Sequence, residues 1–116
     1  MSTEATLSHH LRAFNESVDS IMRDYTETSV LFTPDGPLTG LEAIRAFFDG
    51  FLRTAPPELL RAMALVRQDV QGDFAYILWK AEPFIPLATD TFVVRDGKIL
   101  AQSFAVLAPT PAPATV

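Results

Sequence analysis

The chain has 116 residues, of which 48% are hydrophobic and 20% are charged, a composition that predicts one folded domain rather than a disordered segment. Its formal net charge is −5, and the sequence has no Lys/Arg-rich stripe or basic amphipathic helix, which argues against nucleic acid or a membrane as the partner. The absence of cysteine excludes disulfides, thiol nucleophiles and thiolate metal sites, and it is compatible with a reducing cytoplasm.

The first half of the chain predicts three helices and one short strand. Apolar residues recur at helical spacing in three stretches, and a β-branched and aromatic run lies between the second and the third. The predicted elements are a helix from Ser8, a short helix from Asp19 or Ser20 to Tyr25, a strand over 29–33, and a helix capped by Thr39 that ends before Pro56. Residues 1–6 are expected to be frayed, and residues 34–37 to form a turn.

The second half predicts a meander of strands. The stretch 58–70 is ambiguous, because it begins with strong helix formers and ends in a more extended pattern. Residues 74–81, 89–95 and 98–107 are predicted strands, with a turn between the last two. Helices followed by such a meander predict an α+β fold, with the helices packed on one face of a mostly antiparallel sheet. A proline-rich tail over 109–116 is expected to be disordered, which leaves a single domain over 1–108.

One carboxylate stands out in this pattern. Successive side chains of a strand point to opposite faces, so Asp90 shares a face with Ala88, Phe92 and Val94. Strands disfavour Asp unless something holds it there. Either that face is wet at its end, or the protein keeps an acid in an apolar place for a chemical purpose.

Three phrases and their order resemble the nuclear-transport-factor-2-like superfamily, with the SnoaL-like and ketosteroid-isomerase-like branches as the nearest. The phrases are AFNESVDSIMRDYTETSVLFTPDG, LTGLEAIRAFFDGFL and TDTFVVRDGKILAQSFAV, which together cover most of the chain. The resemblance implies a curved sheet wrapped around three helices as a cone open at one end. It also implies a strand over 59–70 and a homodimer formed through the outer face of the sheet.

The resemblance to ketosteroid isomerase can be carried over residue by residue. That enzyme moves a proton with an Asp base, while a Tyr and a protonated Asp form the oxyanion hole. The oxyanion Tyr falls on His10, the protonated Asp on Asp90, two supporting Tyr residues on Tyr25 and Phe48, and the base on Phe32. Because Phe32 cannot accept a proton, steroid isomerase activity itself is not implied. The SnoaL-like cyclases, in which one sheet carboxylate can act as the base of an aldol closure, are the nearer analogy.

The predicted site therefore centres on Asp90 as the acid/base group, with His10 and Tyr25 assisting. The predicted pocket wall consists of Phe14, Met22, Phe32, Phe48, Phe51, Trp79, Phe92 and Val94. The sequence leaves open which sheet face Trp79 occupies. It also leaves open whether Asp90 is a neutral donor or an anion paired with an imidazolium at His10. No phosphate loop or metal-ligand spacing is present, so neither a cofactor nor a metal is predicted.

The first functional hypothesis is binding of a small, largely apolar molecule, with isomerase, cyclase or lyase chemistry on a carbonyl compound. The second is a non-catalytic binding module with the same pocket, and the third is an interaction module whose cone is filled by its own aromatic side chains. Each site residue also has a structural explanation: Asp90 at a wet strand end, His10 on the surface, Tyr25 in the core. The N-terminus lacks signal-peptide features and no apolar run is long enough to span a bilayer, so a cytoplasmic location is expected.

Overall fold

The structure is a computed structural model that describes residues 1–107. Its helices are α1 (Thr3–Ala13), α2 (Val18–Met22), α3 (Leu41–Thr54) and α4 (Pro57–Ala62). Its strands are β1 (Tyr25–Thr33), β2 (Gly36–Thr39), β3 (Met63–Gln71), β4 (Phe74–Ala81), β5 (Ile85–Arg95) and β6 (Lys98–Leu107). Of the helices formed by these residues, none has the length and apolar character that a bilayer crossing needs. The predicted tail at 109–116 lies outside the described residues.

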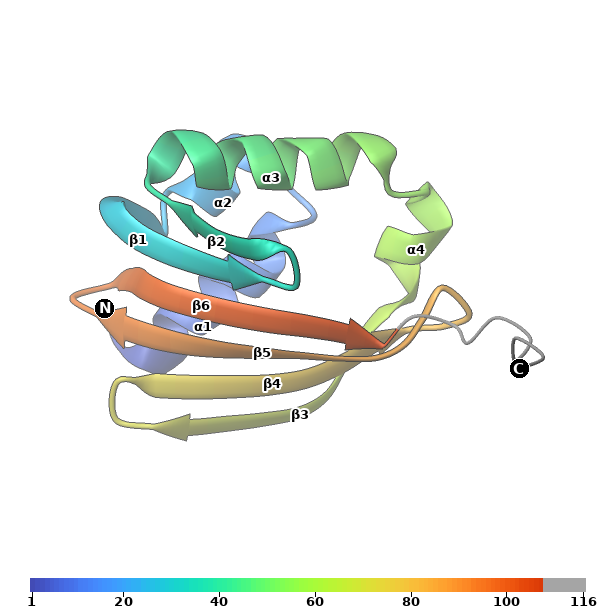
Figure 1. The fold of residues 1–116 in the computed structure, drawn as a ribbon. Helices are drawn as coiled ribbons and strands as arrows, with labels where there is room; N and C mark the ends of the chain where they lie inside the picture. The colour runs from blue at the N-terminus through green and yellow to red at the C-terminus, as the bar shows by residue number, and fades with distance from the viewer. Residues whose placement is uncertain (108–116) are drawn as a thin grey trace, which may run out of the picture.

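The strands form one curved sheet in the order β2-β1-β6-β5-β4-β3, with the helices packed against it (Figure 1). β1 and β6 run parallel, and the other neighbouring strands run antiparallel. Register shifts interrupt the β3–β4, β4–β5 and β5–β6 ladders, and β-bulges of this kind bend strands and increase their twist. The bending makes the sheet concave on one side. The predicted α+β architecture with a mostly antiparallel, curved sheet is confirmed.

The hydrophobic core lies between the concave face of the sheet and the helices. Leu7 of α1 and Ile21 of α2 are almost fully buried there, as is Phe92 of β5. α3 contributes Ile44 and Phe48, which stand four residues apart and so lie on the same side of the helix. Burial of this apolar surface is the main favourable term in folding, and it fixes the helices over the sheet.

The N-terminal helix begins earlier than the sequence predicts. Ser2 is its N-cap, and the Ser2 Oγ accepts a hydrogen bond from the backbone N–H of Ala5 at 3.0 Å. The predicted cap, Ser8, lies inside the helix and is exposed. Residues 1–6 are therefore not frayed: the Thr3 hydroxyl donates to the carbonyl of Gly72 at 2.7 Å, which ties the first turn to the β3–β4 loop.

The segment between β1 and α3 also differs from the prediction. Residues 36–39 form β2, an edge strand, where Pro37 is tolerated because one side of the strand needs no partner. The N-cap of α3 is Gly40, not Thr39, and no side chain caps the helix. Gly40 has φ +89°, a left-handed value that favours glycine, and a Cβ at this position would meet the carbonyl oxygen of Glu27 at 3.3 Å.

The ambiguous stretch 58–70 contains both of the elements that its sequence suggests. A short helix, α4, begins at Pro57, a residue type suited to the first helical position. β3 follows from Met63, so the strand expected from position 59 starts four residues later. The predicted turn between the last two strands is present, with Asp96 at φ 53° and Gly97 at φ 74°, as a type I′ hairpin turn requires.

Candidate functional site

A cavity of about 280 Å³ lies between the concave face of the sheet and helices α1 and α3. Its volume is slightly below the usual range of ligand pockets, which begins at about 300 Å³. Most of the wall is aromatic or aliphatic. The lining residues are His10, Leu11, Phe14, Phe47, Phe48, Phe51, Met63, Leu65, Ile77, Trp79, Ile85, Asp90, Phe92, Phe104 and Val106.

Asp90 is the acidic residue of this wall. It is 9% exposed, and its β5 neighbours on the same face, Ala88 and Phe92, are buried too, as the strand alternation predicts. Trp79 Nε1 donates to Asp90 Oδ1 at 2.8 Å, and Gln102 Nε2 donates to Asp90 Oδ2 at 2.8 Å. The first bond places Trp79 on the inner face of the sheet. Asp90 therefore does not lie at a wet strand end, and both of its oxygens are held in place.

Two opposing effects set the acidity of Asp90. Burial raises the pKa of the carboxyl group above its ordinary value of 3.8, because the anion loses solvation. The hydrogen bonds from Trp79 and Gln102 stabilise the anion and oppose this rise. The net pKa is raised, so Asp90 can take up and release a proton nearer to neutral pH than an exposed Asp.

Gln102 connects Asp90 to Tyr25. The Tyr25 hydroxyl donates to Gln102 Oε1, and the Gln102 amide donates onward to the carboxylate. Tyr25 is buried in the core and is not among the residues that line the cavity. Burial, together with the nearby charges of Asp90 and Asp24, raises the pKa of Tyr25 well above 10, so its hydroxyl stays protonated. Tyr25 is therefore linked to Asp90 through Gln102 and does not line the cavity itself.

His10 lines the cavity from α1. Its side chain is 2% exposed, and its ring meets those of Phe14 and Phe92 edge-on, at centroid distances of 5.2 and 5.5 Å. Burial lowers the pKa of His10 to about 3, and the charge of the adjacent His9 adds to this effect. The imidazole is therefore neutral at pH 7. An ion pair between Asp90 and an imidazolium at His10, one of the sequence alternatives, is disfavoured by this burial.

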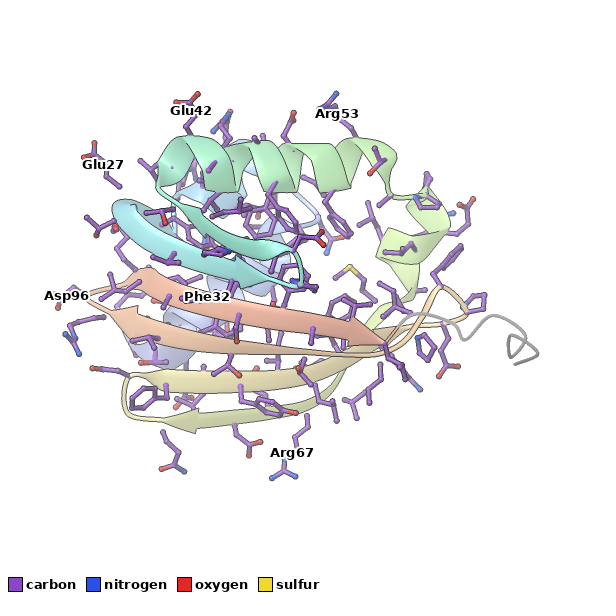
Figure 2. All side chains as sticks on the ribbon, in the orientation of Figure 1. Glu27, Phe32, Glu42, Arg53, Arg67 and Asp96 are labelled. Atoms are coloured by element: carbon purple, nitrogen blue, oxygen red, sulfur yellow. The ribbon has the colours of Figure 1, made fainter. Side chains whose placement is uncertain are left out.

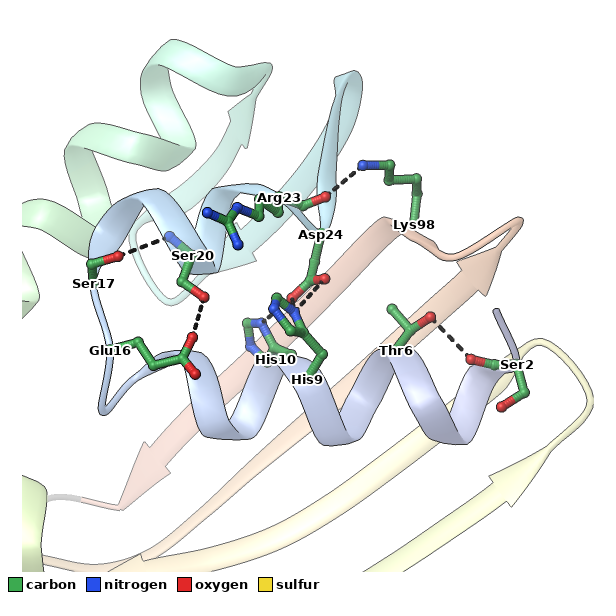
Figure 3. Close-up of polar contacts among 10 residues, drawn as sticks. All are labelled: Ser2, Thr6, His9, His10, Glu16, Ser17, Ser20, Arg23, Asp24 and Lys98. Carbon is green, nitrogen blue, oxygen red and sulfur yellow. Dashed lines mark hydrogen bonds and ion pairs between the residues drawn. The ribbon is translucent and has the colours of Figure 1, made fainter.

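A carboxylate that the sequence did not indicate lies behind His10. Asp24 occupies the junction between α2 and β1, is buried, and accepts a hydrogen bond from His9 Nδ1 at 2.8 Å (Figure 3). Gln102 was missed in the same way. The reasoning used for Asp90 would have found it, because Gln102 is a polar residue that shares one strand face with Phe104 and Val106.

Five of the eight residues predicted for the pocket wall lie at the cavity: Phe14, Phe48, Phe51, Trp79 and Phe92. Met22 and Val94 are instead packed into the hydrophobic core. Phe32 is 49% exposed on the outer face of the sheet (Figure 2). The parallel register pairs Phe32 with Ser103 and Leu31 with Gln102, so Leu31 is the residue that shares the inner face with Gln102. Leu31 cannot act as a base either.

The described residues provide one acid and one neutral imidazole at an apolar wall. Within residues 1–107, no group of three or more His, Cys, Asp or Glu side chains is arranged to hold a metal ion. The chemistry available from these side chains is proton transfer and hydrogen bonding to a ligand.

Several solved protein structures have a fold similar to that of this chain. A SnoaL-like protein of unknown function from Burkholderia thailandensis superposes with a TM-score of 0.76 at 18% identity, over 91% of this chain and 95% of that one. A candidate polyketide cyclase from Sinorhizobium meliloti gives 0.70 at 17% identity, over 87% and 94% of the two chains. A candidate ketosteroid isomerase from Kribbella flavida gives 0.69 at 12% identity, over 97% and 83%. At these identities the similarity shows the fold alone.

The sequence comparison identifies the family. No curated protein matches the chain. The sequence model of the SnoaL-like domain matches residues 7–102, a range that begins within α1 and includes the candidate site residues His10 and Asp90 and the bridging Gln102. The chain therefore belongs to the SnoaL-like domain family.

Proposed function

We propose that the cavity binds a small, largely apolar carbonyl compound and that Asp90 transfers a proton at the carbon next to the carbonyl group. The observation that carries this proposal is a carboxyl group at an apolar cavity wall, held by N–H donors on both oxygens. A positioned acid or base with a pKa shifted toward neutrality is what general acid–base catalysis requires.

The charges at the wall support an uncharged ligand. Among the described residues that line the cavity there is no Lys or Arg, so a phosphate or carboxylate ligand would find no cation and would meet Asp90. The aromatic and aliphatic wall favours an apolar body. Since the volume is at the small end for ligand pockets, the ligand is smaller than a typical drug-sized molecule.

The proposed step begins with Asp90 as the carboxylate. It accepts a proton from the ligand carbon, and the C–H bonding pair moves toward the carbonyl to form an enolate. Return of the proton to another carbon would isomerise the ligand, whereas attack of the enolate on a second carbonyl would close a ring. The neutral His10 contacts the ligand by hydrogen bonding, and Tyr25 fixes Gln102 and through it the carboxylate. The candidate cyclase and isomerase among the structural relatives fit this class of reaction.

A test without the natural substrate uses 2-tetralone, a small bicyclic ketone with exchangeable protons next to its carbonyl. Trp79 is the one tryptophan of the chain and lines the cavity, so its fluorescence should change as 2-tetralone binds. In D₂O, the protein should increase deuterium uptake into the ketone above the rate in matched buffer, as measured by proton NMR. Binding without faster exchange would favour the non-catalytic binding module, and absence of both would contradict the proposal.

We also propose that the protein is a homodimer formed through the outer face of the sheet, in the cytoplasm. The outer face exposes Phe32, Phe74 and Leu107, of which Phe74 is 60% exposed. These side chains lie on three different strands of that face, and a partner sheet that covered them would remove apolar surface from water. Light scattering should give a mass twice the 12.8 kDa of one chain. A mass of one chain at micromolar concentration would contradict the dimer.

A further inference from the structure

Asp24 lies between two adjacent histidines. His9 Nδ1 is 2.8 Å from both of its carboxylate oxygens, and His10 Nδ1 is 3.9 Å from Asp24 Oδ2 (Figure 3). The two imidazoles differ in their surroundings. The His9 side chain is 23% exposed, whereas His10 is buried and lines the cavity. Asp24 therefore stands between a histidine that reaches solvent and one that faces the ligand cavity.

The Nδ1 atom of His10 has no hydrogen-bond partner among the described residues, although it is buried. A neutral imidazole carries its proton on either Nδ1 or Nε2. The carboxylate of Asp24 is the charged group that faces Nδ1, and a negative charge at 3.9 Å favours the tautomer that places the proton on that side. A bare Nδ1 would instead put a lone pair opposite the carboxylate.

We propose that Asp24 is a positioning residue that holds His10 in the Nδ1–H tautomer, so that the bare Nε2 is a hydrogen-bond acceptor for a ligand in the cavity. A carboxylate also selects the histidine tautomer in hydrolytic triads, where it is hydrogen-bonded to Nδ1–H; here the 3.9 Å separation leaves the charge of Asp24 to act without that hydrogen bond. The charged and titratable groups around Asp24 are His9 and His10 on α1, Tyr25 beside it in the chain, and Lys98 on β6. His9 and Lys98 stabilise the carboxylate against the effect of burial.

This tautomer restricts the ligand class, a step that rests on the proposed function. The indole N–H of Trp79 and the hydroxyl of Tyr25 are donated within the protein, as is one N–H of the Gln102 amide. Of these three residues, only Trp79 lines the cavity. With Nε2 bare, His10 offers the ligand an acceptor rather than a donor. The carbonyl compound that fits best therefore carries a hydroxyl group that donates a hydrogen bond to His10 Nε2. Asp90 transfers a proton at the carbon next to the carbonyl group of the same compound.

The tautomer can be measured on the ligand-free protein by long-range proton–nitrogen NMR, which separates a protonated ring nitrogen from a bare one. The chain has two histidines, and His9→Gln assigns the remaining signals to His10. At pH 7 we expect a protonated Nδ1 and a bare Nε2 on His10. A protonated Nε2 with a bare Nδ1 would overturn the proposal.

Asp24→Asn tests whether the charge of Asp24 sets the tautomer of His10. The amide keeps the shape of the carboxylate but removes its charge, so a measurable share of His10 should move to the Nε2–H tautomer. The matched control is Asp19→Asn, the same change at an exposed residue of α2 that pairs with Arg45; it should leave the His10 signals unchanged. Unchanged tautomer populations in a folded Asp24→Asn protein would contradict the role of Asp24.

Two small aromatic probes, one with a hydroxyl group and one without, test the predicted preference for a hydroxyl-bearing ligand. 2-Naphthol should bind about three- to tenfold more tightly than naphthalene, the gain of one neutral hydrogen bond, and the gain should shrink in Asp24→Asn. Equal affinities would contradict the hydroxyl preference. Because neither the tautomer nor the naphthol measurement depends on proton transfer, their outcomes are separable from failure of deuterium exchange into 2-tetralone.

Discussion

Asp90→Asn is expected to slow protein-catalysed deuterium exchange into 2-tetralone by about 10²–10⁴-fold, the usual contribution of a general acid or base. Asn has nearly the shape of Asp but cannot accept the proton at neutral pH. Since the aromatic wall is untouched, 2-tetralone should still change the fluorescence of Trp79. The measurement is the exchange rate by proton NMR at saturating ketone.

The matched control for this variant is Asp69→Asn. Asp69 is a β3 residue that pairs with Arg67 at the surface, away from the cavity. The control should exchange at the wild-type rate. In Asp90→Asn an NH2 group replaces one carboxylate oxygen and faces the N–H donor of either Trp79 or Gln102, so the substitution is expected to cost about 1–3 kcal/mol of stability. A folded Asp90→Asn protein with wild-type exchange would show that another group moves the proton.

The second large effect is acid destabilisation through His10. The pKa of His10 is about 3 in the folded protein, against an ordinary histidine value of 6.5, so the unfolded chain binds more protons between these pH values. The free energy of unfolding should therefore fall as the pH is lowered from 6.5 toward 3. Each pKa unit of difference corresponds to about 1.4 kcal/mol, which gives up to roughly 5 kcal/mol from this one side chain. The raised pKa values of Asp24 and Asp90 act in the opposite direction.

The His10 contribution is isolated by comparing urea unfolding of the wild type and His10→Gln at several pH values. The variant should lose less stability on acidification, because Gln does not titrate. Parallel curves for the wild type and His10→Gln would contradict the buried neutral state of His10.

Local patterns predicted much of this structure. The alternation along β5 placed Asp90 on the buried face with Phe92, and the same reasoning applied to β6 would have found Gln102. The strands 74–81 and 98–107 were predicted with their observed ends, because strong β-formers there are bounded by clear turns.

Pairing between distant segments could not be predicted from local patterns. The face on which Phe32 lies is set by the parallel register of β1 against β6, some seventy residues away in the chain. The contact of His10 with Asp24 depends on how α1 packs against the α2–β1 junction. For the same reason the sequence could name His10 but not its burial or its protonation state.

The central claim is that Asp90 is a carboxyl group held in an apolar cavity with a pKa suited to proton transfer. Its most direct test is a carbon-13 NMR titration of the Asp90 side chain in the ligand-free protein. We predict a midpoint above the ordinary value of 3.8, because burial disfavours the anion. A midpoint at or below 3.8 would show that burial does not raise the pKa of Asp90 and would contradict the proposed function.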